Sequence, residues 1–258
     1  MNNSIVVNAD DFGWNKTCSS AILESFDKGY ITTTTACVNG AFFSEAVSLI
    51  KETPYRNRVG IHINLTEGKP VSEGIMTNKL FCNDNGEFTF FSKRLKILSS
   101  EDKKNVYDEI TAQVQKYKTT GLIIHHADSH HHIHNAPNIY HIFMKVMEEQ
   151  GIRRIRKFRN IGSINCAKRL AKKYYNMQLD LSGLSFTDYF GEISDLGNFD
   201  ELKLDRKTLE IMIHPDYNTS NILIDRDASA EYSCPFGESL GEIYNKLEAR
   251  NITVLRDY

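Results

Sequence analysis

Short runs of β-branched residues alternate with helical patterns along most of this 258-residue chain, and this alternation limits the folds it can adopt. Apolar spacing predicts strands over 4–9, 31–38, 58–65, 121–130, 152–156, 208–215 and 252–257. It predicts helices over 15–28, 42–52, 101–119, 138–150, 163–175 and 237–250. Alternation of this kind favours a mostly parallel sheet. No glycine-rich nucleotide-binding motif follows the first strand, so we predict an α/β fold, a (β/α) barrel variant of about seven mostly parallel strands.

We expect one domain over residues 1–258, since no linker, repeat or low-complexity tract interrupts the pattern. The polar stretch 66–100 contains turn sequences such as TEGKP and NDNGEF. A connection of that length is usually functional, so we interpret it as a lid or an inserted flap.

Composition excludes several classes of protein. The net charge of −2 gives no overall attraction to nucleic acid or to anionic membranes. No apolar run approaches the roughly 20 residues of a membrane span, and MNNSIVVNADDFG is unlike a signal peptide. The five cysteines form an odd number without a C-x-x-C pair, which is typical of reduced, buried thiols. We therefore expect a cytoplasmic protein with neither a nucleic-acid nor a membrane partner; a homodimer stays open.

Polar residues interrupt or follow the predicted strands at four places: Asp10-Asp11, His62, the stretch from Asp128 to His134, and His214. In α/β barrels the active site lies at the carboxyl ends of the strands, where such residues would meet. Adjacent carboxylates such as Asp10 and Asp11 repel each other unless a cation or hydrogen-bond donors compensate. An Asp pair before Phe-Gly is also ordinary turn or helix-capping chemistry, and a lone strand histidine is often a core residue.

The stretch ADSHHHIHNAP, residues 127–137, places four of the nine histidines within five positions. Asp128, His130, His132 and His134 recur with period two, so an extended chain would point them to one side. In that conformation His130 and His134 would be about 13 Å apart, whereas a metal–nitrogen bond is about 2 Å. Unless the chain turns sharply, His130 and His134 could not both bind one ion. At most one or two of the three histidines would therefore be ligands, and His130 is the first choice because it lies nearest the strand end. The alternative is a histidine-rich loop without a special role.

The neighbouring histidines His125, His126, His131 and His141 are interpreted as structural or surface residues. One aspartate and two imidazoles would form a mixed oxygen and nitrogen donor set. Such a set suits zinc, manganese, nickel, cobalt or iron, and magnesium where waters complete the coordination. Three protein ligands leave coordination positions open, as a catalytic metal requires.

Several motifs together resemble the YdjC/ChbG-type carbohydrate deacetylases. They are NADDFG (8–13), GYITTTTACVN (29–39), GIHINLTEGKP (60–70), DSHHHIH (128–134), FTDYFG (186–191) and IMIHP (211–215), which occur in the family's order across almost the whole chain. The resemblance implies a (β/α) barrel variant. It also implies a hydrolase that removes acetyl groups from N-acetylated sugars such as chitooligosaccharides, with a divalent metal ion, magnesium or zinc.

The resemblance also implies roles for individual residues. Asp11, His62 and His130 would bind the metal ion. Asp10 would be the general base and His214 the general acid of amide hydrolysis. In that chemistry the metal polarises the acetyl carbonyl and activates water, the base accepts the water's proton, and the acid protonates the departing nitrogen.

Four further residues would support this site. Asp128 would orient a metal-binding histidine, while His132 and His134 would contact the sugar or orient the site. Arg156 in IRRIR matches an arginine of the family and is a candidate site residue.

The chain departs from the family pattern in two places. Residues 215–218 read PDYN where a glycine often follows the proline, and CPFGESL (234–240) lacks the expected arginine. The shape of the first loop and any sugar contact from that arginine are therefore not carried over.

Residues 151–173 contain nine lysines or arginines and no acid. Such a run is usually a solvated helix face, but it could also recruit an anionic substrate. This run would favour one alternative function, a metal hydrolase acting on a phosphorylated sugar or a non-sugar amide. Two histidines and a carboxylate are also the ligand set of an Fe(II) oxygenase. A non-catalytic sugar-binding protein is the third alternative.

Overall fold

The computed structural model of the protein describes residues 3–162, 165–195, 207–227, 239–249 and 252–254. The chain divides into two compact units. Unit 1 comprises Met1–Phe12, Lys16–Thr34 and Arg154–Tyr258, and unit 2 comprises Gly13–Asn15 and Thr35–Arg153.

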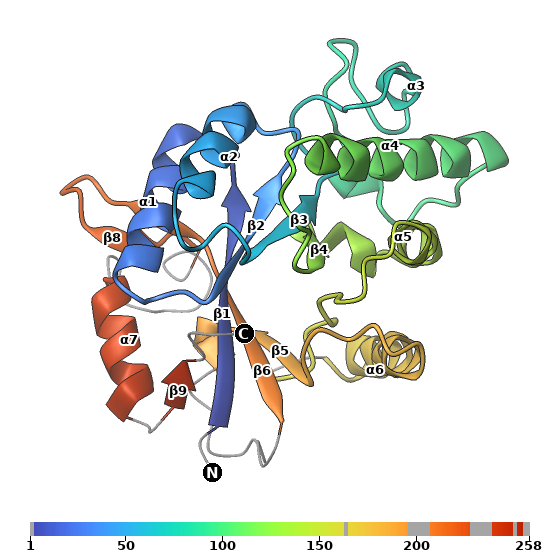
Figure 1. Cartoon of the computed structure of the whole chain (residues 1–258). Helices are drawn as coiled ribbons and strands as arrows, with labels where there is room; N and C mark the ends of the chain where they lie inside the picture. Colours follow the sequence, from blue (N-terminus) through green and yellow to red (C-terminus); the bar gives the residue numbers. More distant parts are fainter. Residues whose placement is uncertain (1–2, 163–164, 196–206, 228–238, 250–251, 255–258) are drawn as a thin grey trace. The chain divides into compact units, whose positions relative to one another are not determined.

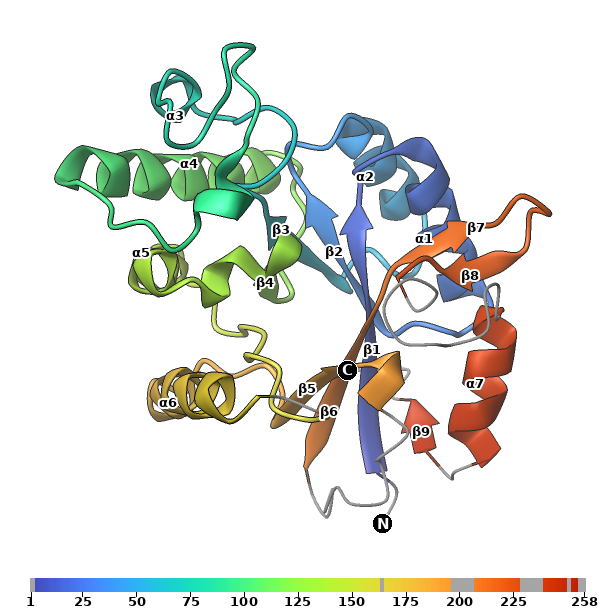
Figure 2. The ribbon, with the colours of Figure 1, turned by 180° about the vertical axis from the view of Figure 1, so that it is seen from behind.

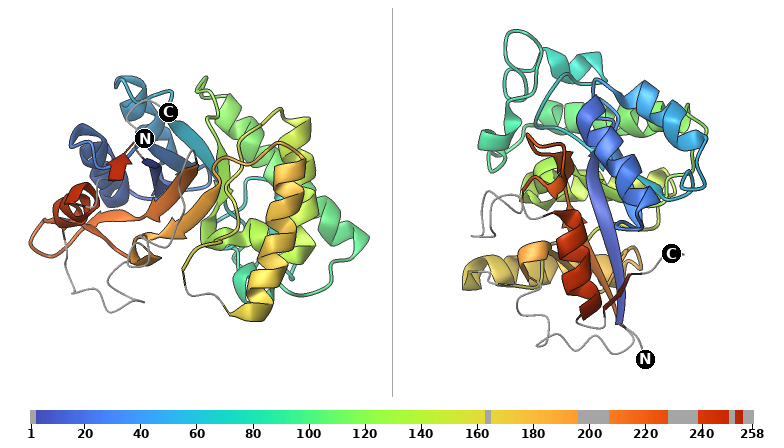
Figure 3. Two further views of the ribbon diagram at one scale, coloured as in Figure 1. Left: turned by 90° about the horizontal axis from the view of Figure 1, so that it is seen from below. Right: turned by 90° about the vertical axis from the view of Figure 1, so that its left-hand side faces the viewer.

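Unit 1 is built around the long strand β1. Its elements are β1 (Asn3–Phe12), α1 (Lys16–Asp27), α6 (Cys166–Leu181), β5 (Tyr189–Glu192), β6 (Thr208–Ile213), β7 (Pro215–Tyr217), β8 (Leu223–Asp225), α7 (Leu240–Ala249) and β9 (Ile252–Val254). β1 pairs in parallel with β6 and with β9, and β6 pairs in parallel with β5 (Figure 1). β7 and β8 form an antiparallel hairpin beside α1, seen from behind in Figure 2. α7 contacts β9, and the two lie side by side in the right-hand view of Figure 3.

Unit 2 contains a parallel strand pair and most of the helices. Its elements are α2 (Phe43–Lys51), β3 (Val59–Ile63), α3 (Glu73–Met76), the 3-10 helix η1 (Phe90–Lys93), α4 (Ser100–Lys118), β4 (Ala127–Ser129), the 3-10 segment η2 (His130–Asn135) and α5 (Pro137–Glu149). β3 pairs in parallel with β4, with His62 opposite Asp128. α4 contacts α5 and α3 (Figure 1). β2 (Thr33–Cys37) begins in unit 1 and ends in unit 2.

The local sequence explains where these elements form and end. Ile5, Val6 and Val7 of β1 are all buried, so both faces of the strand are covered, as is usual in parallel sheets. α1 ends before Gly29, whose φ of 69° lies in the left-handed region that glycine enters without strain. α4 begins with a capping box, in which Ser99 and Asp102 exchange hydrogen bonds between side chain and backbone.

Two of the predicted strands differ from the structure: one is shorter than predicted and the other does not form. The strand expected over 121–130 is reduced to Ala127–Ser129. The strand expected over 152–156 is absent, and only an isolated bridge between Ile155 and Ser185 remains. The side chain of Arg156 in this segment turns into the interior of unit 1.

The segment 66–100 contains more structure than its composition suggests. Besides α3 and η1, it has a bridge between Cys82 and Phe88, and the rings of Phe81 and Phe90 are 4.5 Å apart. The buried carboxylate of Glu109 on α4 accepts the backbone N–H of Val71 at 2.9 Å and that of Ser72 at 2.6 Å. The start of the segment is therefore fixed to α4.

The mostly parallel α/β architecture is confirmed by the parallel pairs β1–β6, β1–β9, β5–β6 and β3–β4, with β7–β8 as an antiparallel exception, whereas closure into a full barrel stays a prediction. Cys18, Cys37 and Cys82 are buried thiols rather than halves of disulfides, as expected. The side chains of Cys166 and Cys234, and most of the CPFGESL segment, lie outside the described residues. None of the described helices is both long and apolar enough to cross a bilayer.

Candidate functional site

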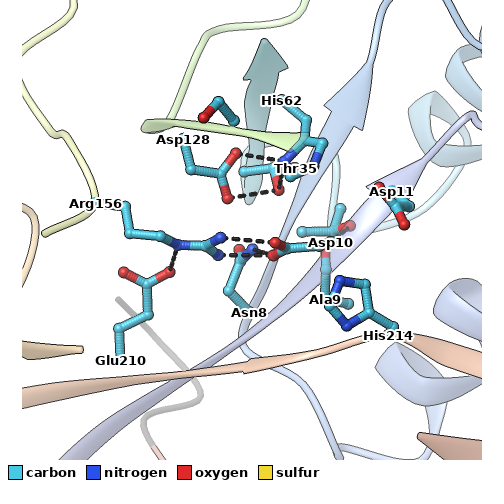
Figure 4. A network of polar contacts seen from close by, with 12 residues as sticks. Asn8, Ala9, Asp10, Asp11, Thr35, His62, Asp128, Arg156, Glu210 and His214 are labelled. Carbon is cyan, nitrogen blue, oxygen red and sulfur yellow. Dashed lines mark hydrogen bonds and ion pairs between the residues drawn. The ribbon is translucent and has the colours of Figure 1, made fainter. Parts of the chain in front are cut away.

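A buried arginine joins two carboxylates in unit 1. Arg156 donates from Nη1 and Nη2 to the two oxygens of Asp10, each at 2.7 Å, and from Nε to Oε1 of Glu210 at 2.6 Å (Figure 4). Asn8 donates to Asp10 at 2.8 Å and accepts from Thr33 at 2.7 Å. Asp10, Arg156 and Glu210 are at most 2% exposed. The paired geometry on Asp10 is the strong, directional form of an arginine–carboxylate contact.

β1 and β6 place these groups. Asp10 lies near the carboxyl end of β1, and Glu210 is the single acid in the apolar strand β6 (TLEIMI). The guanidinium of Arg156 also lies over the ring of Phe190, 4.8 Å from its centroid. The two hydrogen bonds from Arg156 hold the carboxylate of Asp10 in one orientation.

Asp11 has an unusual backbone. Its φ is 71°, in the left-handed region that residues other than glycine rarely enter, while its carbonyl oxygen accepts from the thiol of Cys18 at 3.1 Å. One carboxylate oxygen accepts from Nη2 of Arg226 at 3.1 Å. Burial opposes the charge of Arg226, but attraction by Asp11 and Asp227 outweighs it and raises the pKa of Arg226 above its usual range.

His214 follows β6 and is tied to the β7–β8 hairpin. Its Nδ1 lies 3.1 Å from Oδ2 of Asp227, and its backbone N–H donates to Asp225 at 3.0 Å. The backbone N–H of Arg226 donates to the carbonyl of His214 at 2.9 Å. Burial raises the pKa of Asp225, although the charge of His214 opposes the shift. Within unit 1, Arg226 therefore contacts both Asp11 and His214.

In unit 2 a buried carboxylate orients a histidine. Nδ1 of His62 lies 2.7 Å from Oδ1 of Asp128, and the hydroxyl of Thr35 donates to the other oxygen of Asp128 at 3.0 Å (Figure 4). The β3–β4 register brings His62 opposite Asp128. All three residues are buried. A carboxylate on one ring nitrogen fixes the tautomer and orientation of a histidine, which is the arrangement typical of metal-binding imidazoles.

The chain does not stay extended from Asp128 to His134. The strand ends at Ser129, and His131 and His132 have φ values of 50° and 51° within η2. The chain therefore turns sharply after His130, and the period-two pattern does not place the histidines on one side. The left-handed backbone of two consecutive non-glycine residues is a strained feature of the kind found at functional sites.

Because of the turn, His130 and His134 have different neighbours. His130 packs edge-on against His62 with ring centroids 5.5 Å apart, and it stacks on Trp14 at 5.6 Å. Its Nε2 lies 3.4 Å from Oε2 of Glu67. His134 is buried, with 1% of its surface exposed, and its ring lies beside that of Phe143.

The other histidines have separate partners. His131 contacts Thr66 and the ring of Phe91, His132 lies edge-on to His134 at 6.5 Å, and His125 contacts His126 at 3.0 Å.

Two groupings in unit 2 could hold a metal ion. Cys37, His62 and His130 are buried, and each offers a ligand atom within 4.8 Å of the others. Glu67, His130 and His131 form a second, more exposed group, whose ligand atoms also lie within 4.8 Å of one another. His130 belongs to both groups. Thiolate and imidazole donors at this spacing are compatible with a divalent cation of the zinc type.

Several residues at these sites were not among the sequence candidates. They are Asn8, Thr35, Cys37, Glu67, Glu210 and Arg226. Glu210 could have been noticed, because a lone acid within an apolar strand requires a buried partner. Cys37 lies near the end of the predicted strand 31–38, but a single cysteine is most often a core residue. Arg226 gives no comparable signal in the sequence.

A family model described as YdjC-like protein matches residues 4–246. The chain belongs to the YdjC-like family. Among the relatives of this chain, the carbohydrate deacetylase of Clostridium beijerinckii is 30% identical over 94% of this chain and 91% of its own length. The carbohydrate deacetylase of Listeria monocytogenes serotype 4a is 33% identical over 83% of this chain and 81% of its own. That of Geobacillus stearothermophilus is 31% identical over 82% and 79%.

The fold of this YdjC-like chain is shared with a solved structure. A crystal structure from Enterococcus faecalis V583, provisionally described as a cellobiose-phosphate cleavage protein, matches with a TM-score of 0.72. The match covers 99% of this chain and 97% of the other at 21% sequence identity. At that identity the likeness shows a common fold.

Proposed function

We propose that the protein is a carbohydrate deacetylase that removes acetyl groups from N-acetylated sugars, such as chitooligosaccharides, with the help of a divalent cation. The named relatives in the family support the reaction class. The observation that carries the metal dependence is the buried His62–Asp128 contact beside His130 and Cys37. Nδ1 of His62 is engaged by Asp128, so Nε2 is the ring nitrogen that we assign to the cation.

The proposed ligands are Asp11, His62 and His130, the set implied by the order of the family motifs. The donor chemistry fits such an ion, because imidazoles oriented by carboxylates and a nearby thiol are found together in zinc-type sites. Cys37 adds a soft donor beside His62 and His130, and soft donors favour zinc over magnesium. When bound, the cation would polarise the acetyl carbonyl and lower the pKa of a bound water.

Two residues of unit 1 would move the protons. Asp10 would accept the proton of the attacking water, and the two contacts from Arg156 hold its carboxylate in one orientation for that task. His214 would protonate the amide nitrogen, which must carry the proton before it can leave. Asp227 beside Nδ1 would leave Nε2 of His214 as the proton-donating atom. Acetate and a free amino sugar result.

Trp14 is an aromatic residue next to the proposed ligand His130 in unit 2. Its half-buried ring stacks on His130, and the 66–100 segment approaches it at Gly68. Sugar rings pack well on aromatic faces because their C–H groups form an apolar surface. We assign Trp14 to the recognition of the N-acetylated ring.

The experiment measures acetate release from N-acetylglucosamine oligomers, with and without a chelator. We expect release that the chelator abolishes and that added zinc restores. Asp11→Asn, His62→Ala and His130→Ala should each lose metal, measured by elemental analysis, and lower the rate by at least about 100-fold.

The matched control is His141→Ala, an exposed histidine on α5, which should keep both metal content and rate. His214→Ala should lower the rate by about 100-fold while metal content stays unchanged. Release of phosphate from sugar phosphates without acetate release, or full metal content in His62→Ala, would overturn the proposal.

A further inference from the structure

Unit 1 contains a basic cavity that the proposed reaction does not use. It has a volume of about 660 Å³, within the range of small-molecule sites. Six basic residues line it: Lys157, Arg159, Arg169, Lys172, Lys173 and Lys207. Asp180 and Asp188 are the two acids in the lining, so basic residues exceed acidic ones by four.

One face of α6 forms the first wall. Arg169, Lys172, Lys173 and Asn176 follow one another at helical spacing, so they lie on the same side of the helix. Asn176 donates to the carbonyl of Phe158 at 2.8 Å and accepts its backbone N–H at 2.9 Å. The ring of Phe158 stacks on Tyr175 at 5.1 Å. The segment that carries Lys157 and Arg159 is thereby fixed to α6.

The acids of the cavity already have partners. Asp180 pairs with Lys157 at 2.7 Å, and Asp188 accepts the backbone N–H of Thr208 at 2.8 Å. Arg159 pairs with Glu192 and Asp195. By contrast, Arg169, Lys172, Lys173 and Lys207 make no ion pair with any acid in the described ranges 3–162, 165–195, 207–227, 239–249 and 252–254.

The electrostatic field in the cavity favours an anion. Lys172 is half-buried, and burial together with the positive charges of Arg159 and Lys168 lowers the pKa of its ammonium group. The positive charges thus oppose one another, and a bound anion would relieve that repulsion.

One side of the cavity lies at the opposite end of the strands from Asp10. Lys207 and Tyr189 stand at the beginnings of β6 and β5. Thr208 pairs with Ser4, six residues before Asp10 on β1. Six residues of extended strand span about 20 Å, so an anion at this end would not reach Asp10.

We propose that this cavity binds a small phosphorylated ligand. Phosphate offers several acceptor oxygens and up to two negative charges, which suits converging lysine and arginine side chains. Met177 and Leu181 border the cavity and are largely exposed, so an organic part attached to the phosphate would find apolar contacts. The size of the cavity argues for a small molecule, and the inference stands independently of the deacetylase proposal.

The test is isothermal titration calorimetry of the whole protein at physiological ionic strength. The probes are inorganic phosphate, pyrophosphate, glucose 6-phosphate and, as the uncharged comparison, glucose. We expect pyrophosphate or glucose 6-phosphate to bind with a Kd below about 1 mM and glucose not to bind. Tighter binding of glucose 6-phosphate than of inorganic phosphate identifies an organic phosphate ester. Equal binding identifies the free phosphate group, and both results support the site.

The site is located with variants. Lys172→Gln/Lys173→Gln should weaken phosphate binding by at least about tenfold, because two charge-assisted contacts are lost. Lys51→Gln/Lys103→Gln removes the same charge from exposed positions elsewhere and should change it less than about twofold. Lys207→Gln, on the other wall, is the second variant should the first fail to fold. Failure of every phosphate probe to bind, or equal binding in the cavity and control variants, overturns the proposal.

Discussion

Arg156 donates from three nitrogen atoms, and each faces a carboxylate oxygen in the interior of unit 1. Burying charges is costly, and the cost is recovered only where partners and geometry are good. Two carboxylates, Asp10 and Glu210, share this one guanidinium. Arg156 therefore has a structural task in addition to orienting the proposed base.

Arg156→Ala should lower the free energy of unfolding by about 3–5 kcal/mol, because both carboxylates would remain buried without their counter-charge. Urea denaturation measures the loss. Arg153→Ala, three residues earlier and exposed, should change stability by less than about 0.5 kcal/mol. Equal stabilities for the two variants would show that the buried contacts with Asp10 and Glu210 are compensated elsewhere.

At the scale of single elements, α4 determines the position of the segment that follows β3. Glu109 accepts the backbone N–H groups of Val71 and Ser72, and Gln113 exchanges two hydrogen bonds with the backbone of Asn64. Backbone groups of the segment thus satisfy the buried polar side chains of Glu109 and Gln113. Its start is ordered by α4 rather than by its own sequence.

Glu109→Ala should release this start. We expect the amides of residues 66–76 to exchange with deuterium at least about tenfold faster, because the N–H groups of Val71 and Ser72 lose their acceptor. Hydrogen exchange with mass spectrometry measures the effect. Glu101→Ala, exposed on the same helix, should leave the exchange unchanged; protection retained in Glu109→Ala would contradict the anchoring role.

Elements with a strong apolar period were predictable from the sequence, and those defined by distant partners were not. α4 and α5 are found within one residue of their expected bounds, since their buried faces repeat at helical spacing. β5 and the β7–β8 hairpin were missed because three or four residues carry too little pattern. The segment 152–156 reads as a strand, yet only Ile155 makes a bridge.

The same division applies to the candidate site. Asp10, His62 and His130 were recognisable as polar residues at strand ends. The left-handed turn at His131 and His132 was not, because neither residue type requires it. Arg156 was expected near the site from the resemblance, but its shared contact with Glu210 depends on the β1–β6 pairing.

At the scale of the whole molecule, each unit contains a weak acid held in its neutral form. Burial, assisted by the charge of Glu109, raises the pKa of Cys82 in unit 2 from 9.0 to about 11. Burial and the hydrogen bond to Glu24 raise the pKa of Tyr217 in unit 1 from 10.0 to about 12. In both cases the unfolded chain releases its proton at a lower pH than the native protein does.

The free energy of unfolding should therefore fall as the pH rises from about 9 to 12, because the native state binds more protons than the unfolded state there. Below pH 9 both contributions are fully present. Tyr217→Phe should remove the part of the decline between pH 10 and 12, measured by urea denaturation at several pH values. Tyr174→Phe, at an exposed position, should keep the wild-type slope, and a stability independent of pH across this range would contradict the assignment.

The left-handed backbone at Asp11 restricts what mutation can leave behind there. Asparagine and glycine tolerate that conformation, whereas alanine and branched residues resist it. In a related protein that has lost this carboxylate, we therefore expect asparagine or glycine at the position of Asp11, because both preserve the backbone conformation. In related sequences, asparagine or glycine directly after the first aspartate would therefore indicate that the backbone turn is kept without the second carboxylate.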